Sequence, residues 1–180
     1  YESNPLDASS IDQEMCRILN DLGSISASTI QADSLTTITI FDSLVQDTLS
    51  FIHLSNVNNW EIPIDGASYF ILHAPQEADS YFVAFNSFSE FHLYNNDGTL
   101  IQPDSENSSL RSIAGCPDIR VRQTFSQLSG VYLAKLVNPN VSSVKMVVMN
   151  TNNAPSANFT TSTSDAFVGD TITFMDESSQ

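Results

Sequence analysis

The stretch Gly130-Val131-Tyr132-Leu133-Ala134-Lys135-Leu136-Val137 decides the class of fold. Its side chains alternate, so that Tyr132, Ala134 and Leu136 share one face while Lys135 points to the other. Valine, tyrosine and leucine fill most of the positions, and the valine and tyrosine are strong β formers. A period of two in such residues predicts a β-strand with one face in a core.

Segments of the same kind recur along the chain from residue 35 to residue 149, with turn residues between them. Tyr81 to Phe85 is apolar on both faces, so we expect it to be a central strand. Asp97-Gly98 favours the positive φ angles of a tight hairpin turn. The nine predicted strands are Leu35 to Phe41, Thr48 to Leu54, Trp60 to Ile64, Ser68 to His73, Ser80 to Phe85, Phe88 to Tyr94, Ile119 to Phe125, Gly130 to Val137 and Val144 to Met149.

A helical pattern precedes the strands. Ser10 can cap this helix, with Gln13 at the reciprocal position of a capping box, and Gly23 follows as a stop signal. We predict a helix over about residues 11–22 that packs onto its own domain; a partner-binding face is the alternative. Its apolar stripe consists of Ile11, Met15, Ile18, Leu19 and Leu22.

These elements predict a mainly β protein, an antiparallel β-sandwich or jelly roll with one N-terminal helix. A parallel α/β sheet is excluded because no crossover helices separate the predicted strands. We divide the chain into an N-terminal segment (1–34), a β-sandwich domain (35–152) and a C-terminal segment (153–180).

The composition indicates an exported protein. With 21 acidic and 6 basic residues the net charge is −15, which disfavours nucleic acid as a partner. Ser, Thr and Asn supply much of the polar surface, as is typical of exported β proteins. No window approaches the roughly 18 apolar residues of a membrane span. We expect an extracellular or cell-surface location, with any signal peptide removed before Tyr1.

Two cysteines, Cys16 and Cys116, lie far apart in the sequence. A disulfide between them would close a loop of about a hundred residues, and in the chain-entropy model it would stabilise the fold by about 4 to 5 kcal/mol. Two buried thiols are the alternative, and a zinc site lacks further ligands at suitable spacing. We predict the disulfide, which would fix the helix to its domain.

The chain carries none of the motifs G-x-S-x-G, H-E-x-x-H, G-x-x-x-x-G-K-[ST] or G-x-G-x-x-G. His53, His73 and His92 each lie in a predicted strand, and we interpret them as strand-surface residues. A Ser/His/Asp grouping assembled in space stays an alternative. We therefore assign no catalytic and no cofactor-binding residue, and predict that the chain is not an enzyme.

Calcium is an open alternative, since acidic residues near the strand ends could supply oxygen ligands. No D-x-[DN]-x-[DN]-G loop is present, so no metal ligand is assigned. The acids concerned are Asp42, Asp47, Asp65, Asp79, Asp97 and Asp104.

Two aromatic residues are candidates for stacking on a ligand such as a sugar. Trp60 follows the polar run Asn56-Val57-Asn58-Asn59, and Tyr94 adjoins the predicted hairpin turn. The alternative for Trp60 is a place in the core of the sandwich.

Three segments, in this order, resemble the bacterial pre-peptidase C-terminal domain: Ser68-Tyr69-Phe70-Ile71-Leu72-His73-Ala74-Pro75-Gln76, Phe91-His92-Leu93-Tyr94-Asn95-Asn96-Asp97-Gly98 and Leu128-Ser129-Gly130-Val131-Tyr132-Leu133-Ala134-Lys135-Leu136. The resemblance implies a small jelly-roll sandwich, an accessory module of secreted peptidases and other exported enzymes. Calcium-binding members carry paired acids before the first of these strands. Asp65 is followed here by Gly66, so the resemblance carries over no calcium site.

The C-terminal segment resembles the opening of a PKD domain, an immunoglobulin-like sandwich of surface proteins and secreted hydrolases. Ala154-Pro155-Ser156-Ala157-Asn158-Phe159 would enter the first strand, and Phe167-Val168-Gly169-Asp170-Thr171-Ile172-Thr173-Phe174 would turn into the second. Two strands of such a domain are marginal alone. The resemblance implies a truncated domain beginning at about residue 153, in a protein that continues past Gln180.

We therefore expect a non-catalytic accessory, binding or spacer module of a secreted or cell-surface multidomain bacterial protein. Its expected partners are neighbouring domains of the same protein and an extracellular protein or polysaccharide. The alternatives are an adhesin domain that binds carbohydrate or protein, and part of a secreted hydrolase whose active site the sequence does not reveal.

Overall fold

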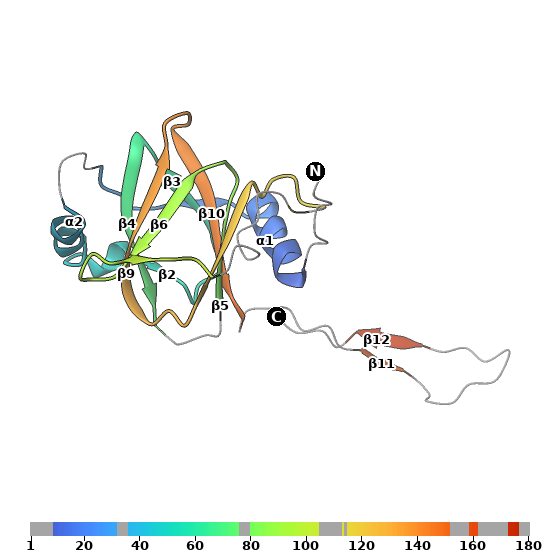
Figure 1. Cartoon of the computed structure of the whole chain (residues 1–180). Coiled ribbons are helices and arrows are strands. Elements are labelled where there is room, and N and C mark those ends of the chain that lie inside the picture. Colours follow the sequence, from blue (N-terminus) through green and yellow to red (C-terminus); the bar gives the residue numbers. More distant parts are fainter. Residues whose placement is uncertain are drawn as a thin grey trace.

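The computed structural model describes residues 9–31, 36–75, 80–104, 113, 115–151, 159–161 and 173–176. Two five-stranded sheets pack face to face as a sandwich, with one α-helix against the outside of each sheet (Figure 1). The helices are α1 (Ser10–Asp21) and α2 (Thr37–Leu44). The predicted β-sandwich with an N-terminal helix is confirmed.

Sheet 1 has β10 at its centre, antiparallel to both of its neighbours, β3 and β5. Its first strand, β1, lies at the edge and runs parallel to β3. In spatial order sheet 1 consists of β1 (Ser24–Ser26), β3 (Asn59–Pro63), β10 (Ser143–Asn150), β5 (Ser80–Phe85) and β8 (Val121–Ser126).

Sheet 2 has β9 at its centre, the strand from which the fold was predicted. Its edge strand β2 runs parallel to β4, and the short 3₁₀ helix η1 (Thr48–Ser50) comes just before β2. In spatial order sheet 2 consists of β2 (Ile52–His53), β4 (Gly66–Ala74), β9 (Gly130–Asn138), β6 (Glu90–Tyr94) and β7 (Leu100–Ile101).

Both sheets are therefore mixed, whereas a wholly antiparallel sandwich was predicted. A parallel pair needs a long crossover connection. The segment between β1 and β3 provides one and contains α2. Strand β1 was not predicted from the sequence. It has only three residues, all of them exposed, so it shows no apolar alternation toward a core.

The main core fills the space between the sheets. In β9, Ala134 and Leu136 face this core and Tyr132 packs against it, while Leu133 faces the α2 side, as the alternation predicted. Strand β5 is buried on both faces, with Phe82 and Ala84 toward α1, and it has a neighbour on each side, as expected of a central strand. Large side chains of the main core include Phe70, Leu72, Phe85, Phe125, Leu136 and Met146.

Helix α1 packs on the outer face of sheet 1. Met15, Ile18 and Leu19 of the predicted stripe are buried against this sheet. Its cap differs from the prediction: Ser9, not Ser10, is the N-cap, and Asp12, not Gln13, completes the capping box. The helix therefore begins at Ser10.

Helix α2 replaces the strand predicted at Leu35 to Phe41, which was wrong. The run is rich in β-branched residues, which favour strands. Thr36 nevertheless caps a helix, its hydroxyl accepting from Thr39 N at 3.3 Å. Ile40, Phe41 and Leu44 recur at helical spacing and are buried against sheet 2. Packing of this apolar face outweighs the local β propensity.

The predicted strand Thr48 to Leu54 is shorter than expected. Asp47 accepts a hydrogen bond from Leu49 N at 3.3 Å and caps η1, so that the extended part is limited to Ile52–His53. The other predicted strands are present, with ends that differ by at most two residues, and Ser80–Phe85 has the predicted bounds.

The predicted Asp-Gly hairpin is confirmed between β6 and β7. Gly98 has a φ of +82°, and its backbone N–H donates to Asn95 O at 2.9 Å. A Cβ atom at Gly98 would lie 2.9 Å from Thr37 Oγ1 in α2. Glycine is thus required both by the turn and by the close approach of α2.

In the C-terminal segment, β11 (Phe159–Thr161) and β12 (Phe174–Asp176) pair antiparallel in a two-stranded sheet of their own. Residues 154–158 and 167–172 of the PKD-like motif lie outside the described residues. Among the described helices, none has the length and apolar character needed to cross a membrane.

Candidate functional site

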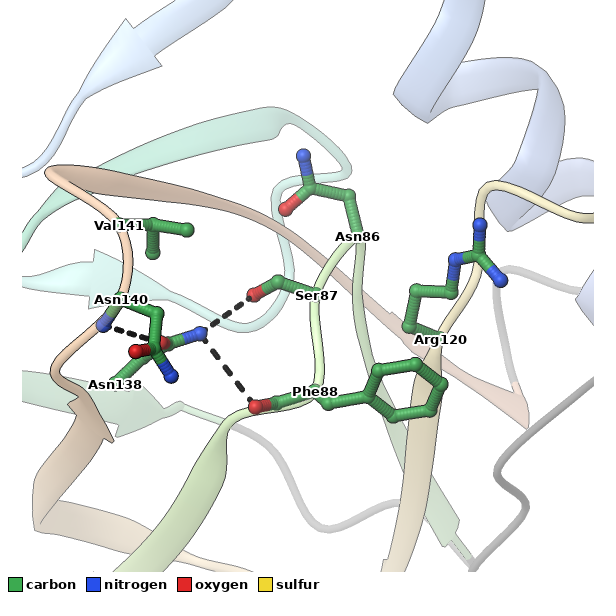
Figure 2. Close-up of a pocket in the computed structure, with 7 residues that line it drawn as sticks. All are labelled: Asn86, Ser87, Phe88, Arg120, Asn138, Asn140 and Val141. Carbon is green, nitrogen blue, oxygen red and sulfur yellow. Dashed lines mark hydrogen bonds between the residues drawn. The ribbon is translucent and has the colours of Figure 1, made fainter.

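A shallow pocket of about 410 Å³ lies at one end of the sandwich, where the β5–β6 loop meets the β9–β10 loop. Arg120, which precedes β8, closes one side of it (Figure 2). The lining residues are Asn86, Ser87, Phe88, Arg120, Asn138, Asn140 and Val141.

Asn138, the last residue of β9, holds the two loops together. Its side chain is 5% exposed, and its Nδ2 donates to Ser89 Oγ at 3.0 Å and to Ser87 Oγ at 3.4 Å. Its Oδ1 accepts from Asn140 N at 3.0 Å, within its own loop. One buried amide therefore uses donor and acceptor groups to position both walls of the pocket.

Asn86 extends the pairing of β5 with β10 into the pocket. Its backbone N–H donates to Lys145 O at 3.1 Å, and its Oδ1 accepts from Lys145 N at 2.9 Å. Arg120 is fixed in a similar way, because its backbone N–H donates to Phe85 O at 2.8 Å. The backbones of Asn86 and Arg120 are thus both hydrogen-bonded to strands of sheet 1.

The exposed surface of the pocket combines an aromatic ring with a cation. The side chain of Phe88 is 63% exposed, and the Arg120 guanidinium carbon lies 5.8 Å from the centre of its ring. Val141 adds a further exposed apolar side chain. An exposed ring beside a guanidinium and several amides suits binding by stacking and hydrogen bonding.

The lining residues offer no carboxylate, imidazole or thiol for acid–base chemistry. Ser87 has a hydroxyl, but it is hydrogen-bonded to the Ser89 hydroxyl at 2.8 Å. A serine nucleophile needs an adjacent base, and no other lining residue provides one. The chemistry of these lining residues suits contacts with a ligand by stacking and hydrogen bonding.

The sequence did not point to Phe88, which it placed at the start of the strand Phe88 to Tyr94. The strand begins at Glu90, which leaves Phe88 in a loop. The signal was present in Asn86-Ser87-Phe88-Ser89, because a phenylalanine among small polar residues fits a loop as well as a strand.

The two aromatic residues singled out from the sequence lie elsewhere. Trp60 is half-buried on β3 and packs against the main core. Tyr94 is half-buried on β6 and packs on the α2 side of sheet 2, with its ring centre 6.3 Å from that of His92. The structure does not bring Trp60 and Tyr94 together in one site, and stacking of either on a ligand stays a prediction.

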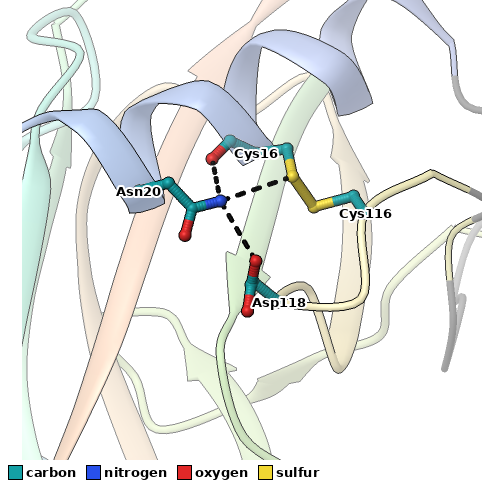
Figure 3. Close-up of a disulfide and its surroundings, with 4 residues drawn as sticks. All are labelled: Cys16, Asn20, Cys116 and Asp118. Atoms are coloured by element: carbon teal, nitrogen blue, oxygen red, sulfur yellow. Dashed lines mark hydrogen bonds between the residues drawn. A yellow bond between two sulfur atoms is a disulfide. The ribbon is translucent and has the colours of Figure 1, made fainter.

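The disulfide Cys16–Cys116 is confirmed, with 6.0 Å between the two Cα atoms (Figure 3). It joins the middle of α1 to the segment before β8. Asn20 Nδ2 reinforces this link by donating to Cys16 O at 3.0 Å and to Asp118 Oδ2 at 3.1 Å. The bond has the geometry of a structural cross-link between the helix and sheet 1.

The three histidines all lie in strands, but two of them meet. His53 Nδ1 and His73 Nδ1 are 3.0 Å apart, on the neighbouring strands β2 and β4. Burial, followed by the charge of His53, lowers the pKa of His73. His92 lies on β6, two strands away from β4.

Several of the acids considered for calcium have structural roles, and Asp42 lies within α2 while Asp47 caps η1. Asp97 Oδ1 accepts from Thr99 N at 2.9 Å, and Asp104 accepts from the backbone and hydroxyl of Ser126 at 3.0 and 2.7 Å. Asp79 lies outside the described residues. Within the described part of the chain, no three or more His, Cys, Asp or Glu residues cluster as metal ligands. Calcium stays a prediction.

Comparison of the chain with protein-family models, curated proteins and solved structures yields no match. The resemblances to the pre-peptidase C-terminal domain and to the PKD domain therefore stay predictions.

Proposed function

We propose that this protein is a non-catalytic binding module that binds a saccharide at the end-loop pocket. The observation that carries the proposal is the exposed ring of Phe88 beside the Arg120 guanidinium, in a pocket that is also lined by asparagine amides. Aromatic faces stack on the apolar faces of sugar rings, as on other flat ligands. Amide groups can at the same time donate to and accept from sugar hydroxyls.

Arg120 favours acidic saccharides over neutral ones. Its guanidinium is the only charged group among the lining residues, and a guanidinium pairs with carboxylates through two parallel hydrogen bonds. The site therefore accepts neutral sugars and favours sugars that carry a carboxylate. The net charge of −15 opposes such ligands at long range, but salt screens this repulsion beyond about 8 Å at physiological ionic strength.

We further propose that the module belongs to a secreted or cell-surface multidomain bacterial protein. The disulfide supports this location, because disulfides persist in oxidising compartments. The polar, acidic composition and the two resemblances to modules of exported proteins support it as well. An adhesin domain that binds protein, and a domain of a secreted hydrolase, are the competing functions.

A glycan array followed by calorimetric titration tests the binding site. The array should contain neutral oligosaccharides and matched oligosaccharides of uronic acids. We expect binding that Phe88→Ala weakens by about tenfold or more, since removal of a central aromatic contact commonly costs above 1 kcal/mol. Arg120→Gln should weaken binding of the acidic sugars more than that of the neutral ones.

The matched control is Leu49→Ala, which removes an apolar side chain that is 97% exposed and lies outside the pocket. It should leave binding unchanged. Absence of binding to every glycan at high protein concentration, or equal binding by Phe88→Ala, would refute the saccharide site. Release of new reducing ends from a bound oligosaccharide would favour the hydrolase instead.

A further inference from the structure

The pair His53 and His73 lies outside the pocket and brings two imidazole rings into direct contact. The two residues are direct partners in the parallel pairing of β2 with β4. Their Nδ1 atoms are 3.0 Å apart, and their ring planes are inclined at 72° with 5.0 Å between the centres. Both side chains are half-buried, so solvent reaches them.

We propose that His53 and His73 form a binding site for a divalent late first-row transition metal ion, held by the two Nδ1 atoms. Metal–imidazole bonds are about 2.0 to 2.1 Å long. Two nitrogens 3.0 Å apart then subtend an angle of about 91 to 97° at the ion, given such bond lengths. That is the angle between neighbouring positions of a square or octahedral ion.

The angle between the two Nδ1 atoms at the ion also favours some metal ions over others. A tetrahedral ion such as structural zinc requires about 109°, and hence a separation of about 3.3 to 3.4 Å between the two nitrogens. Cu²⁺ and Ni²⁺ favour tetragonal sites of nitrogen and oxygen ligands, and Cu²⁺ binds most tightly in the series of divalent ions. The site therefore favours Cu²⁺, with water in the remaining positions.

The backbone and a neighbouring ring hold the two imidazoles in place before any ion binds. Leu54 N donates to His73 O at 2.9 Å, which extends the pairing of β2 with β4 past His53. The ring of Phe51 lies 6.4 Å from that of His53 and 6.1 Å from that of His73, measured between centres. The backbone pairing can stay unchanged when an ion binds, while each ring turns until its Nδ1 lone pair points at the ion instead of at the other nitrogen.

The protonation of the pair is compatible with this role. When both rings are neutral, one Nδ1 carries the hydrogen that the other accepts. Moving this hydrogen to Nε2 of the same ring frees both Nδ1 lone pairs for the ion, with no net loss of a proton. The strongly negative protein also raises the concentration of cations near its surface.

The test is a titration of the full chain with CuCl₂ at pH 7.5 after removal of metals by a chelator. We expect one tight ion per chain, and a copper electron paramagnetic resonance spectrum with hyperfine coupling to two imidazole nitrogens. His53→Asn and His73→Asn should each weaken binding by about tenfold or more, as loss of one of two ligands requires. His92→Asn, a histidine of the same sheet, should bind like the wild type.

A second measurement uses the wild-type chain alone and does not depend on the folding of a variant. Nuclear magnetic resonance of the ¹⁵N-labelled imidazoles should show that Cu²⁺, added well below one ion per chain, broadens the Nδ1 signals of His53 and His73 together. Coupling to a single nitrogen, unperturbed Nδ1 signals, or unchanged affinity in both His53→Asn and His73→Asn would overturn the proposal.

Discussion

Asp12 Oδ1 lies 2.9 Å from Arg122 Nε, and this ion pair joins the first turn of α1 to strand β8 in an almost fully buried contact. Asp12 also accepts from the backbone and hydroxyl of Ser9 at 3.2 and 2.7 Å. Arg122 Nη1 donates to Thr124 Oγ1 at 2.9 Å. The same carboxylate thus caps the helix and fixes it to the sheet.

The ion pair is the first of three attachments along α1. The disulfide Cys16–Cys116 holds the middle of the helix. At its end, Asn59 Nδ2 donates to Leu19 O at 3.3 Å and to Leu22 O at 2.9 Å. Each attachment comes from a different part of the chain, so the position of α1 depends on the finished sandwich.

Replacing Arg122 by methionine should destabilise the protein by about 3 to 5 kcal/mol, because removing one partner leaves the other charge buried without compensation. Burial lowers the pKa of Arg122, and the charge of Asp12 acts in the opposite direction. The free energy of unfolding in urea measures the change. Arg17→Met is the control, since Arg17 pairs with Glu14 on the surface, and it should not shift the urea midpoint measurably. If Arg122→Met lowers the free energy of unfolding by less than about 1 kcal/mol, the ion pair contributes no more than a surface pair, which would contradict this account.

Reducing the disulfide should lower the free energy of unfolding by about 4 to 5 kcal/mol, the chain-entropy value for a loop of about a hundred residues. Urea unfolding with and without dithiothreitol gives the difference. The double variant Cys16→Ser with Cys116→Ser should match the reduced wild type and should not respond to dithiothreitol. A wild type that is equally stable in both conditions would mean that the bridge constrains the unfolded chain very little.

Features that depend on local chemistry could be predicted from the sequence. The alternation in Gly130 to Val137, the turn at Asp97-Gly98 and the stripe of α1 each depend on residues close in the chain. The β-sandwich could be predicted because it repeats one such pattern many times. The disulfide could also be predicted, because only two cysteines were available to pair.

Features that depend on contacts distant in the sequence could not be predicted. Helix α2 forms from residues with β propensity because its apolar face is covered by sheet 2. The cap shifted from Ser10 to Ser9 because Asp12, one residue before Gln13, is the residue that meets Arg122. The pocket combines segments that come together only once both sheets are formed.

Replacing Asn59 by alanine should destabilise the protein by about 1 to 3 kcal/mol, because carbonyls at the end of α1 lose a buried donor. Asn59→Asp should cost more, since it presents carboxylate oxygens to carbonyl oxygens. Urea unfolding is the measurement, and Asn56→Ala, at an exposed position, is the control. Equal stability of Asn59→Ala and the wild type would show that water replaces the side chain without loss.

Lowering the pH from 7.5 to 5.5 should destabilise the protein through His73. Its pKa in the folded protein is lowered by burial and then by the charge of His53, whereas in the unfolded chain it is about 6.5. Below that value the unfolded chain therefore binds more protons than the folded protein. The contribution of His73 to the free energy of unfolding is complete above pH 6.5. It is lost as the pH falls through the pKa that His73 has in the folded protein.

Hydrogen bonds hold the pKa values of Glu14, Glu61 and Asp97 below their usual values, so these three carboxylates titrate below this range. Their protonation affects stability at lower pH. Urea unfolding at pH 7.5, 6.5 and 5.5, with a chelator present to exclude metal ions, measures the slope. His73→Gln should flatten it and His92→Gln should not. If the free energy of unfolding of His73→Gln still falls with pH as in the wild type, another group causes the effect. If the wild-type curve is flat, His73 keeps the pKa of the unfolded chain despite its contact with His53.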